Sequence, residues 1–248
     1  MNRALDSAAD TAARGTGIKA LLFDVFGTVV DWRGSVIREA AAFGRANGIA
    51  ADWEEFADAW RGKYGPFMDK VRTGELPWTN LDGLHRLALE ELLEEFGIEG
   101  VDKAAKAELN LAWHRLEAWP DAVAGLTGLK ARYVIAALSN GNVALMTNLA
   151  RYAGLPWDCV LGAELARAYK PDPRTYLTAV ELLGLEPPQV MMVAAHGGDL
   201  DAARGLGLKT AFVPRPLERG PATSAEPVPA TCDVVAADFR DLARKLGG

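Results

Sequence analysis

The residues Ile18-Lys-Ala-Leu-Leu-Phe-Asp-Val-Phe26 give the clearest indication of the fold class, and Gly27-Thr28 ends this apolar run. It is short and mostly apolar, and it lacks the polar–apolar alternation of a strand that faces water on one side. A strand that is apolar on both faces is typical of a parallel sheet covered by helices. The sequence therefore predicts a buried parallel strand at residues 18–26, followed at once by a turn.

The same pattern recurs along the C-terminal half of the chain. Further strands are predicted at Tyr133–Leu138, Val190–Ala195 and Thr210–Val213, with a weaker one at Cys232–Val235. Helical patterns lie between or after them, near residues 142–152, 173–183, 199–206 and 238–246. Because strands that alternate with helices build βαβ units, we expect an α/β fold with a doubly wound parallel sheet. The proline-rich segment 214–230 is expected to be a surface loop.

Residues 34–118 differ from this pattern. They contain no convincing strand but several amphipathic helical patterns, the clearest of which runs from Leu84 to Phe96. Six of the seven tryptophans lie in or beside this block: Trp32, Trp53, Trp60, Trp78, Trp113 and Trp119. Most of them are expected to pack inside a small helical domain, while one or two could line an apolar site. We therefore predict a flexible tail at residues 1–17, an α/β core at 18–33 and 119–248, and an inserted helical cap at 34–118.

Composition excludes several classes of protein. The chain has 248 residues, of which 50% are hydrophobic and 24% charged, the balance of an ordinary globular protein. The net charge is −6 and no basic run occurs, so nucleic acid is not an expected partner. No apolar run approaches the roughly 20 residues that span a bilayer, and residues 1–17 lack the apolar segment of a secretory signal. With only two distant cysteines, Cys159 and Cys232, we expect a cytoplasmic protein without disulfides or a membrane partner.

Polar side chains follow three of the predicted strands and occupy one loop between them. They are Asp24, Ser139, Asn140, Lys170, His196 and Asp199. In open α/β sheets, ligands bind beyond the carboxyl ends of the strands. A lone aspartate after a strand is usually a helix N-cap, but two carboxylates that meet over one lysine are costly to arrange for stability alone. The combination therefore indicates an active site.

In this order the residues resemble the motifs of the haloacid dehalogenase superfamily, from about Ile18 to the C-terminus. Asp24-Val-Phe-Gly-Thr28 resembles the first motif, Ser139-Asn140 the second, Lys170 the third and His196-x-x-Asp199 the fourth. The helical block resembles the cap that such proteins insert between the first and second motifs.

Phe26 separates two branches of that superfamily. Phosphatase members usually carry a second aspartate at this position, two residues after the nucleophile, and a phenylalanine cannot transfer a proton. Together with Ser139-Asn-Gly-Asn142, Tyr169-Lys-Pro-Asp-Pro173 and Tyr176, it makes the chain similar to the type II, or L-2-haloacid, dehalogenases.

That resemblance implies hydrolysis of a short 2-haloacid to a 2-hydroxyacid, without a metal or another cofactor. The Asp24 carboxylate attacks C2 of the substrate, expels halide and becomes an ester. Water activated by Asp199, aided by His196, then hydrolyses the ester. Lys170 keeps Asp24 ionised, and Thr28 donates a hydrogen bond to it.

The resemblance also implies five contacts to the substrate and the departing halide: Phe26, Arg61, Ser139, Asn140 and Tyr176. Phe26 walls an apolar pocket, Ser139 helps to bind the substrate carboxylate, and Arg61, in Trp60-Arg-Gly-Lys63, receives the halide with Asn140. Tyr176 lines the site or contacts the Lys170 loop. The other histidines, His85 and His114, are expected to pack in the cap.

The chain departs from the type II pattern at four positions. A histidine, His196, stands where asparagine is common, and Gly62, Gly197 and Gly198 replace larger side chains. These glycines predict a roomier or more solvated pocket. The preferred halogen, including fluorine, and the size and stereochemistry of the substrate stay open.

Two other functions stay open at this point. A magnesium-dependent phosphatase or phosphonate hydrolase would let Asp24 and Asp199 both reach Mg²⁺, and the phosphonate reaction would need Lys63 or Lys70 for a Schiff base. A binding module on the same fold is the third possibility, because fold alone does not determine function. A homodimer through the tryptophan-rich block is also expected.

Overall fold

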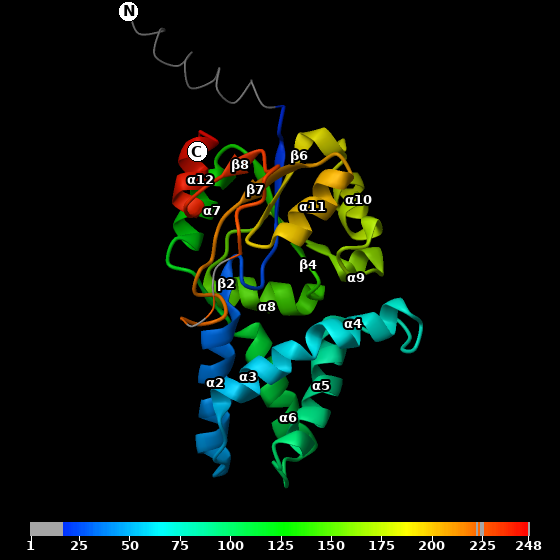
Figure 1. Cartoon of the computed structure of the whole chain (residues 1–248), viewed down its shortest axis with the longest axis vertical. Helices are drawn as coiled ribbons and strands as arrows, with labels where there is room; N and C mark the ends of the chain where they lie inside the picture. The colour runs from blue at the N-terminus through cyan, green and yellow to red at the C-terminus, as the bar shows by residue number, and fades with distance from the viewer. Residues whose placement is uncertain (1–16, 222, 224–225, 248) are drawn as a thin grey trace, which may run out of the picture.

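The computed structural model describes residues 17–221, 223 and 226–247. The predicted tail therefore lies outside the described residues, apart from Gly17. Figure 1 shows two parts, an α/β core that holds the sheet and a group of helices beneath it.

The core is built on a six-stranded sheet in which every neighbouring pair is parallel. Its order is β5 (Cys159–Gly162), β4 (Val134–Ser139), β1 (Ala20–Phe23), β6 (Val190–Ala194), β7 (Lys209–Phe212) and β8 (Val234–Val235). This confirms the predicted α/β class and the five strands expected from the sequence. The strand β5 was not among those predicted; it is a short edge strand whose first two residues are only partly buried.

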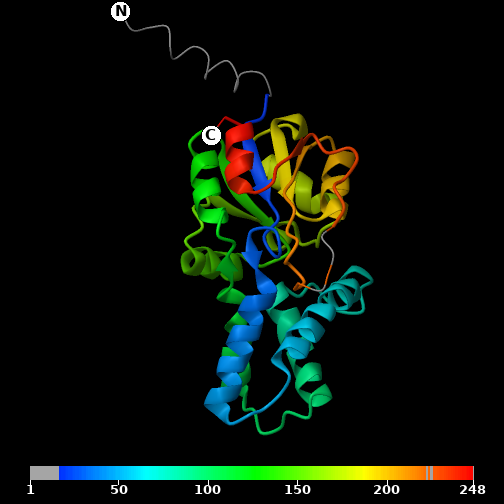
Figure 2. The same ribbon diagram turned by 60° about the vertical axis from the view of Figure 1, so that its left-hand side comes forward.

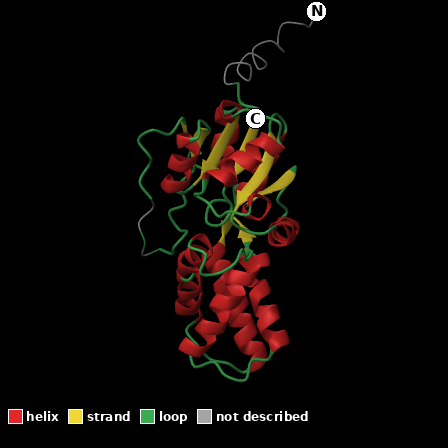
Figure 3. Ribbon diagram, turned by 90° about the vertical axis from the view of Figure 1, so that its right-hand side faces the viewer, coloured by secondary structure: helices red, strands yellow, loops and turns green. Residues whose placement is uncertain are grey.

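Helices cover both faces of the sheet (Figure 3). Along β1, Leu21 and Phe23 pack into one apolar layer, and Ala20 and Leu22 pack into the other. The first layer lies under α7 (Ala122–Lys130), α8 (Val143–Ala153) and α12 (Phe239–Lys245). The second lies under α10 (Pro173–Leu182) and α11 (Gly197–Gly205), while the short α9 (Ala163–Ala166) and η2 (Pro187–Gln189) flank β5 and β6. Burial on both faces explains why β1 reads as a continuous apolar run.

The helical part comprises α2 (Trp32–Asn47), α3 (Trp53–Gly62), α4 (Tyr64–Arg72), α5 (Leu81–Glu95), α6 (Lys103–Asn110) and η1 (Leu111–His114). The chain enters it through β2 (Val30–Asp31) and leaves it through β3 (Glu117–Ala118), which pair as an antiparallel ribbon. The expectation of no strand within residues 34–118 is therefore wrong at its last two positions. The ribbon marks where the chain passes from the core into the helices and back.

Aromatic side chains fill the interior of the helical part. Trp60 and Trp113 are completely buried, and their rings meet edge to face with centroids 5.6 Å apart. Trp78 instead stacks on Tyr169 of the core, with ring centroids 5.0 Å apart. Among the residues that the structure describes, no helix combines the length and apolarity needed to cross a bilayer.

The segment between β7 and β8 has no helix or strand in its described residues. Figure 2 shows it descending from the sheet to the junction with the helical part before it returns to β8. This path brings the segment between β7 and β8, which is far from β1 in the sequence, over the carboxyl end of β1.

Candidate active site

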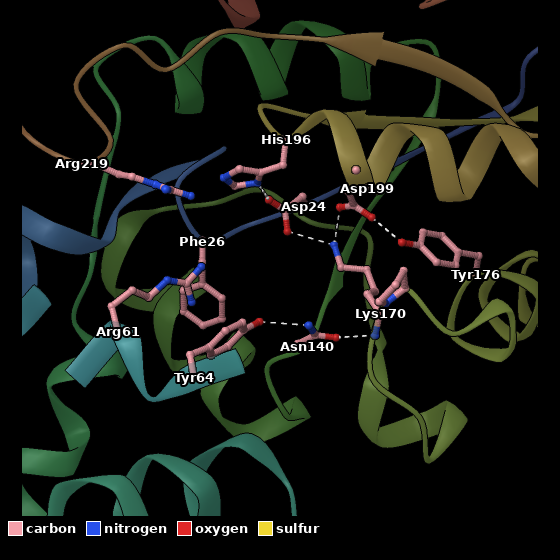
Figure 4. Close-up of a pocket in the computed structure, with 12 residues that line it drawn as sticks. Asp24, Phe26, Arg61, Tyr64, Asn140, Lys170, Tyr176, His196, Asp199 and Arg219 are labelled. Carbon is pink, nitrogen blue, oxygen red and sulfur yellow. Dashed lines mark hydrogen bonds and ion pairs between the residues drawn. The ribbon is translucent and has the colours of Figure 1, made fainter. Parts of the chain in front are cut away.

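Four charged side chains meet at the carboxyl end of the sheet (Figure 4). Asp24 follows β1 directly, Lys170 lies between α9 and α10, and His196 and Asp199 stand at the start of α11, just after β6. Because β1 and β6 are adjacent parallel strands, their carboxyl ends open at the same edge of the sheet. The topology thus brings together the residues that the sequence singled out.

The Lys170 ammonium bridges two carboxylates. Its Nζ lies 2.9 Å from Oδ1 of Asp24 and 2.5 Å from Oδ2 of Asp199, and its side chain is only 8% exposed. Burial disfavours the cation, but the charges of Asp199 and Asp24 raise the pKa of Lys170 above its ordinary value. Lys170 is therefore a permanent cation at this position.

Asp24 is held as a carboxylate by three donors, of which the Lys170 ammonium is one. Thr28 Oγ1 donates to Oδ2 over 2.7 Å, and His196 Nδ1 lies 3.0 Å from the same oxygen. Thr28 is itself fixed, because its Oγ1 accepts a hydrogen bond from the Ala195 N–H over 2.9 Å. Burial alone would favour the neutral acid, but the charges of Lys170 and His196 keep the pKa of Asp24 far below its usual range.

Asp199 has a different electrostatic environment. Tyr176 donates its hydroxyl to Oδ1 over 2.5 Å, and Lys170 donates to Oδ2. Burial raises the pKa of Asp199 above its ordinary value despite the neighbouring Lys170 ammonium. The two carboxylates thus differ in basicity, and Asp199 is the stronger base.

His196 lies between two carboxylates. Its Nδ1 faces Asp24, and its Nε2 lies 2.9 Å from Oε2 of Glu218, which comes from the segment after β7. Burial disfavours the imidazolium, but hydrogen bonds to Asp24 and Glu218 raise the pKa of His196 to about 10. An ionised carboxylate only accepts hydrogen bonds, so both ring nitrogens donate and the ring is charged.

These groups open into a cavity of about 360 Å³ between the two parts of the molecule. It is lined by Asp24, Phe26, Arg61, Tyr64, Asn140, Lys170, Pro171, Tyr176, His196, Gly198, Asp199 and Arg219. A Cβ added at Gly198 would meet no atom within 4 Å, so the missing side chain leaves open space in the wall. Gly62 also faces open space but lies outside this lining, and Gly197 donates its N–H to Glu226.

Arg61 supplies the wall of the cavity opposite the carboxylates. Its guanidinium carbon lies 4.0 Å from the centroid of the Tyr64 ring, 5.4 Å from that of Trp32 and 5.9 Å from that of Phe26. Its Nη1 is buried and has no hydrogen-bond partner among the described residues. A buried cationic donor without a partner is costly unless an anion binds to it.

Asn140 ties the two parts of the molecule together. Its Nδ2 donates to the Tyr64 hydroxyl over 3.0 Å, and its Oδ1 accepts from the Lys170 N–H over 2.7 Å. Ser139, in contrast, is completely buried and is not among the residues that line the cavity. Its Oγ accepts from the Gly141 N–H over 3.0 Å, which orders the loop after β4.

Sequence reasoning missed three groups at the site: Tyr64, Glu218 and Arg219. Tyr64 and Arg219 line the cavity, and Glu218 supports His196 from behind. The strand-end pattern could not indicate them, because one begins a cap helix and the other two lie in an irregular loop.

The lysines needed for phosphonate hydrolysis lie elsewhere. Lys63 pairs with Glu91 and Glu95, Lys70 lies 3.9 Å from Glu75, and neither lines the cavity. No group of three or more His, Cys, Asp and Glu side chains suited to a metal ion occurs within the described ranges.

Comparison with known proteins places this geometry in a family. Residues 18–207 match the haloacid dehalogenase-like hydrolases. A crystal structure of the L-2-haloacid dehalogenase PA0810 is 52% identical, covers 92% of this chain and 98% of its own, and superposes with a TM-score of 0.89.

Two further relatives agree. A crystal structure of the defluorinating L-2-haloacid dehalogenase Rha0230 is 45% identical with a TM-score of 0.90, over 93% of this chain and 96% of its own. The (S)-2-haloacid dehalogenase 1 of Pseudomonas sp. (strain CBS-3) is 33% identical over 202 residues, which are 80% of this chain and 85% of that protein. The chain described here belongs to the haloacid dehalogenase-like hydrolases.

Proposed function

We propose that the protein is an (S)-2-haloacid dehalogenase, which hydrolyses short 2-haloalkanoic acids to 2-hydroxyacids through an ester on Asp24. One observation carries the proposal: an ionised carboxylate, held by Lys170, faces a cavity whose opposite wall offers Arg61, with a buried Nη1 that has no hydrogen-bond partner among the described residues. The activities named for the similar dehalogenases support the same reaction.

Oδ1 of Asp24 is the nucleophilic oxygen in this proposal. Oδ2 already accepts hydrogen bonds from Thr28 and His196, whereas Oδ1 has only the Lys170 ammonium among its described neighbours. An electron pair on Oδ1 forms a bond to C2 as the carbon–halogen bond breaks and halide leaves with that bond pair. Attack opposite the leaving group inverts C2, so (S)-2-chloropropionate yields (R)-2-hydroxypropionate.

Arg61 receives the halide. Its guanidinium is surrounded by the rings of Tyr64, Trp32 and Phe26, which exclude water from the leaving group, and its buried Nη1 is free to donate. A charged donor aimed at a developing anion in such a pocket lowers the barrier by several kcal/mol. The amide of Asn140 lies on the same wall and supports this position.

The substrate carboxylate has two candidate partners. Ser139 is the one that the resemblance implies, but its hydroxyl is buried beside Gly141. Arg219 lines the cavity, and its guanidinium makes no hydrogen bond or ion pair with another described residue. We favour Arg219, because a free cation in the cavity wall suits a carboxylate. Tyr176, whose hydroxyl is engaged by Asp199, orients that carboxylate.

Asp199 is the base for the second half of the reaction. Its raised pKa suits a group that takes a proton from water. The resemblance implies that His196 aids Asp199, and we assign that aid to a hydrogen-bond donor rather than a second base, because a ring between two carboxylates donates from both nitrogens. Its contact with Oδ2 of Asp24 instead suits stabilisation of the oxyanion that forms when water adds to the ester.

The comparisons favour dehalogenation over the phosphorus alternative, and the geometry agrees. Phe26 occupies the position of the phosphatase acid, and Lys170 already bridges the two carboxylates that a magnesium ion would need. A non-enzymatic binding module would not need a nucleophile, a lysine and a second carboxylate in this arrangement. A cytoplasmic location and a homodimer stay predictions from the sequence.

Halide release in excess chelator tests the function. We expect steady release from (S)-2-chloropropionate, none from the (R)-enantiomer, and (R)-2-hydroxypropionate as product. Fluoride release from fluoroacetate, measured in parallel, shows whether the enzyme, with its open cavity wall at Gly198, also cleaves a carbon–fluorine bond. No halide from any 2-haloacid, together with Mg²⁺-dependent phosphate release from a phosphonate, would contradict the proposal.

A further inference from the structure

Glu218 is a buried carboxylate that the reaction described above leaves without a role. Its side chain is 9% exposed, although it lies in an irregular loop. Oε2 lies 2.9 Å from His196 Nε2, and Oε1 accepts a hydrogen bond from Trp32 Nε1 over 3.1 Å. The residue also lies beyond the segment that matches the family, which ends at residue 207.

The loop is built to hold this carboxylate in place. Arg215 donates to both carboxylate oxygens of Asp121, over 2.7 and 2.9 Å, and to the Thr28 carbonyl over 2.8 Å. The Glu218 N–H then donates to the Arg215 carbonyl over 3.1 Å and closes a turn. A bidentate, largely buried arginine pair is a rigid anchor, so Glu218 starts from an ordered backbone.

The turn after β1 is shaped around the same carboxylate. Gly27 has a φ of 83°, which disfavours any other residue. A Cβ at this position would also lie 2.2 Å from Oε1 of Glu218. The glycine in the Asp24-Val-Phe-Gly-Thr28 motif thus leaves the space that Glu218 fills.

We propose that Glu218 is a positioning residue for hydrolysis of the Asp24 ester, holding the His196 ring so that Nδ1–H points at Oδ2 of Asp24. This rests on the proposed function, because it assigns Glu218 to the second half of that reaction. The line Asp24–His196–Glu218 places a fixed cation on the oxygen that Lys170 does not contact.

The chemistry of the step explains why that oxygen matters. Water oxygen adds to Cγ of the ester, the carbonyl electron pair moves onto Oδ2, and Asp199 takes one water proton. The intermediate then expels the 2-hydroxyacid oxygen, which leaves with a proton, and the new carboxyl group loses the remaining proton to solvent. Ester and water thus become carboxylate, hydroxyacid and one proton. The resting carboxylate shares its negative charge between both oxygens, so a full negative charge on Oδ2 develops only in this half of the reaction, where Thr28 and His196 are its donors.

Charge around His196 keeps it a donor over a wide pH range. Asp24 and Glu218 face its two nitrogens, while Asp199 and the cations Lys170, Arg61 and Arg219 line the same cavity. The pKa of His196, about 10, shows that the two carboxylates outweigh the burial of the ring. The pKa of Glu218, conversely, lies below its ordinary value despite burial, because His196 donates to it.

Glu218→Gln tests the proposal, because it removes the charge while keeping the shape and the acceptor for Trp32. We expect kcat to fall roughly ten- to a hundredfold, less than the 10²- to 10³-fold loss that follows removal of an oxyanion donor itself. After rapid acid quenching, a larger fraction of the enzyme should carry the ester, because its formation is spared. The alkaline limb of kcat should move down by roughly one to two pH units, as expected for a lost charged hydrogen bond.

Two controls separate positioning from folding. Glu226→Gln alters an exposed carboxylate of the same loop that accepts a hydrogen bond from the Gly197 N–H, so kcat and its pH profile should stay within about twofold. Glu218→Asp keeps the charge and should restore part of the alkaline activity. In a His196→Asn background, Glu218→Gln should have little further effect, because the residue acts through His196. An equal loss in both backgrounds would overturn the proposal.

A measurement that does not depend on turnover distinguishes failure of this proposal from failure of the proposed function. Imidazole ¹⁵N shifts report the charge of His196 directly, and variants at His85 and His114 assign the three rings. We expect His196 to remain an imidazolium well above pH 8 and to titrate at lower pH in Glu218→Gln. A ring that titrates near its ordinary value of about 6.5 in both proteins contradicts the proposal, whether or not the enzyme releases halide. Absence of halide release with the expected titration would instead contradict the proposed function alone.

Discussion

The two walls of the active-site cavity are built in opposite ways. On the core side, Asp24, Lys170, Asp199 and His196 pair with one another or with neighbouring residues, and each group is held in one charge state. On the cap side, Arg61 rests on aromatic rings and keeps a buried Nη1 without a partner. The core wall is therefore complete before substrate arrives, whereas the cap wall is completed by an anion.

In the proposed mechanism, this difference separates two tasks of the site. Covalent chemistry needs a nucleophile in the correct orientation, which the buried ion network supplies. In the proposed mechanism, release of halide needs a site for the developing anion, and the guanidinium of Arg61 supplies it. We expect changes in the core wall to affect stability and turnover together, and changes in the cap wall to affect mainly turnover.

Lys170→Met should have the largest effect, because it leaves two buried carboxylates without their shared cation. We expect unfolding to become easier by about 3–5 kcal/mol at pH 7 and halide release to fall below detection. The stability deficit should shrink as the pH falls below about 5, because a protonated carboxyl relieves the repulsion. Lys209→Met is the matched control, since its pair with Asp233 is surface-exposed and worth less than about 1 kcal/mol. Chemical denaturation at several pH values measures the free energy of unfolding of both variants.

Arg61→Ala should reduce turnover much more than stability, because it changes the cap wall alone. We expect kcat/KM for (S)-2-chloropropionate to fall about 10²- to 10³-fold, with a change in melting temperature of only a few degrees. Arg61→Lys should recover little, because an ammonium cannot match the planar guanidinium between aromatic rings. Lys63→Ala, two residues further along the chain and paired with Glu91 and Glu95, should keep near-normal turnover. A Lys63 variant as impaired as Arg61→Ala would argue against the cap-wall assignment.

Two histidines, one in each part of the molecule, differ in charge and provide a third test. His196 is charged, with a pKa of about 10, whereas burial lowers the pKa of His85 to about 3. The stabilisation from His196 is fully present below its unfolded pKa of about 6.5 and is lost as the pH rises towards 10. His85 acts in the opposite direction, since it stays neutral in the fold while the unfolded chain gains a proton as the pH falls from about 6.5 to 3.

Melting temperatures across pH 5–10 should separate these two effects. The advantage of the wild type over His196→Asn should shrink between pH 7 and pH 10. His85→Phe should gain stability relative to the wild type as the pH falls from 7 to 5, by up to about 1.4 kcal/mol per pH unit. Parallel curves for all three proteins would refute the assigned charge states.

Gly198→Phe should have the smallest effect on turnover and stability, because it alters only the space between the two walls of the cavity. The open position of Gly198 accepts a Cβ without contact, so the ring would fill the cavity. We expect kcat/KM for 2-chlorobutyrate to fall several-fold more than that for chloroacetate. Gly62→Ala, which lies outside the lining, should leave that ratio unchanged. An unchanged ratio in Gly198→Phe would show that Gly198 does not limit substrate size.

The residues of the core wall could be predicted from the sequence, but only some of those in the cap wall could. Strand ends of a parallel sheet converge, so Asp24, His196 and Asp199 could be placed together from local patterns. Tyr64 and Glu218 carry no such signal, because their positions depend on how a cap helix and a long loop fold back over the sheet. The four-residue strand β5 escaped detection for a different reason, since Cys159–Gly162 is too short to show a strand pattern.

Trapping the ester on Asp24 tests the account most directly. Asp199→Asn removes the base for hydrolysis but keeps the nucleophile, so incubation with (S)-2-chloropropionate should add one carboxyethyl group to the protein, mapped by peptide mass spectrometry to Asp24. The double variant with Asp24→Asn should show no adduct. Stoichiometric halide release with the group on Asp24 is the predicted result. Halide release without any adduct on Asp24, in both Asp199→Asn and acid-quenched wild type, would contradict covalent catalysis by this residue.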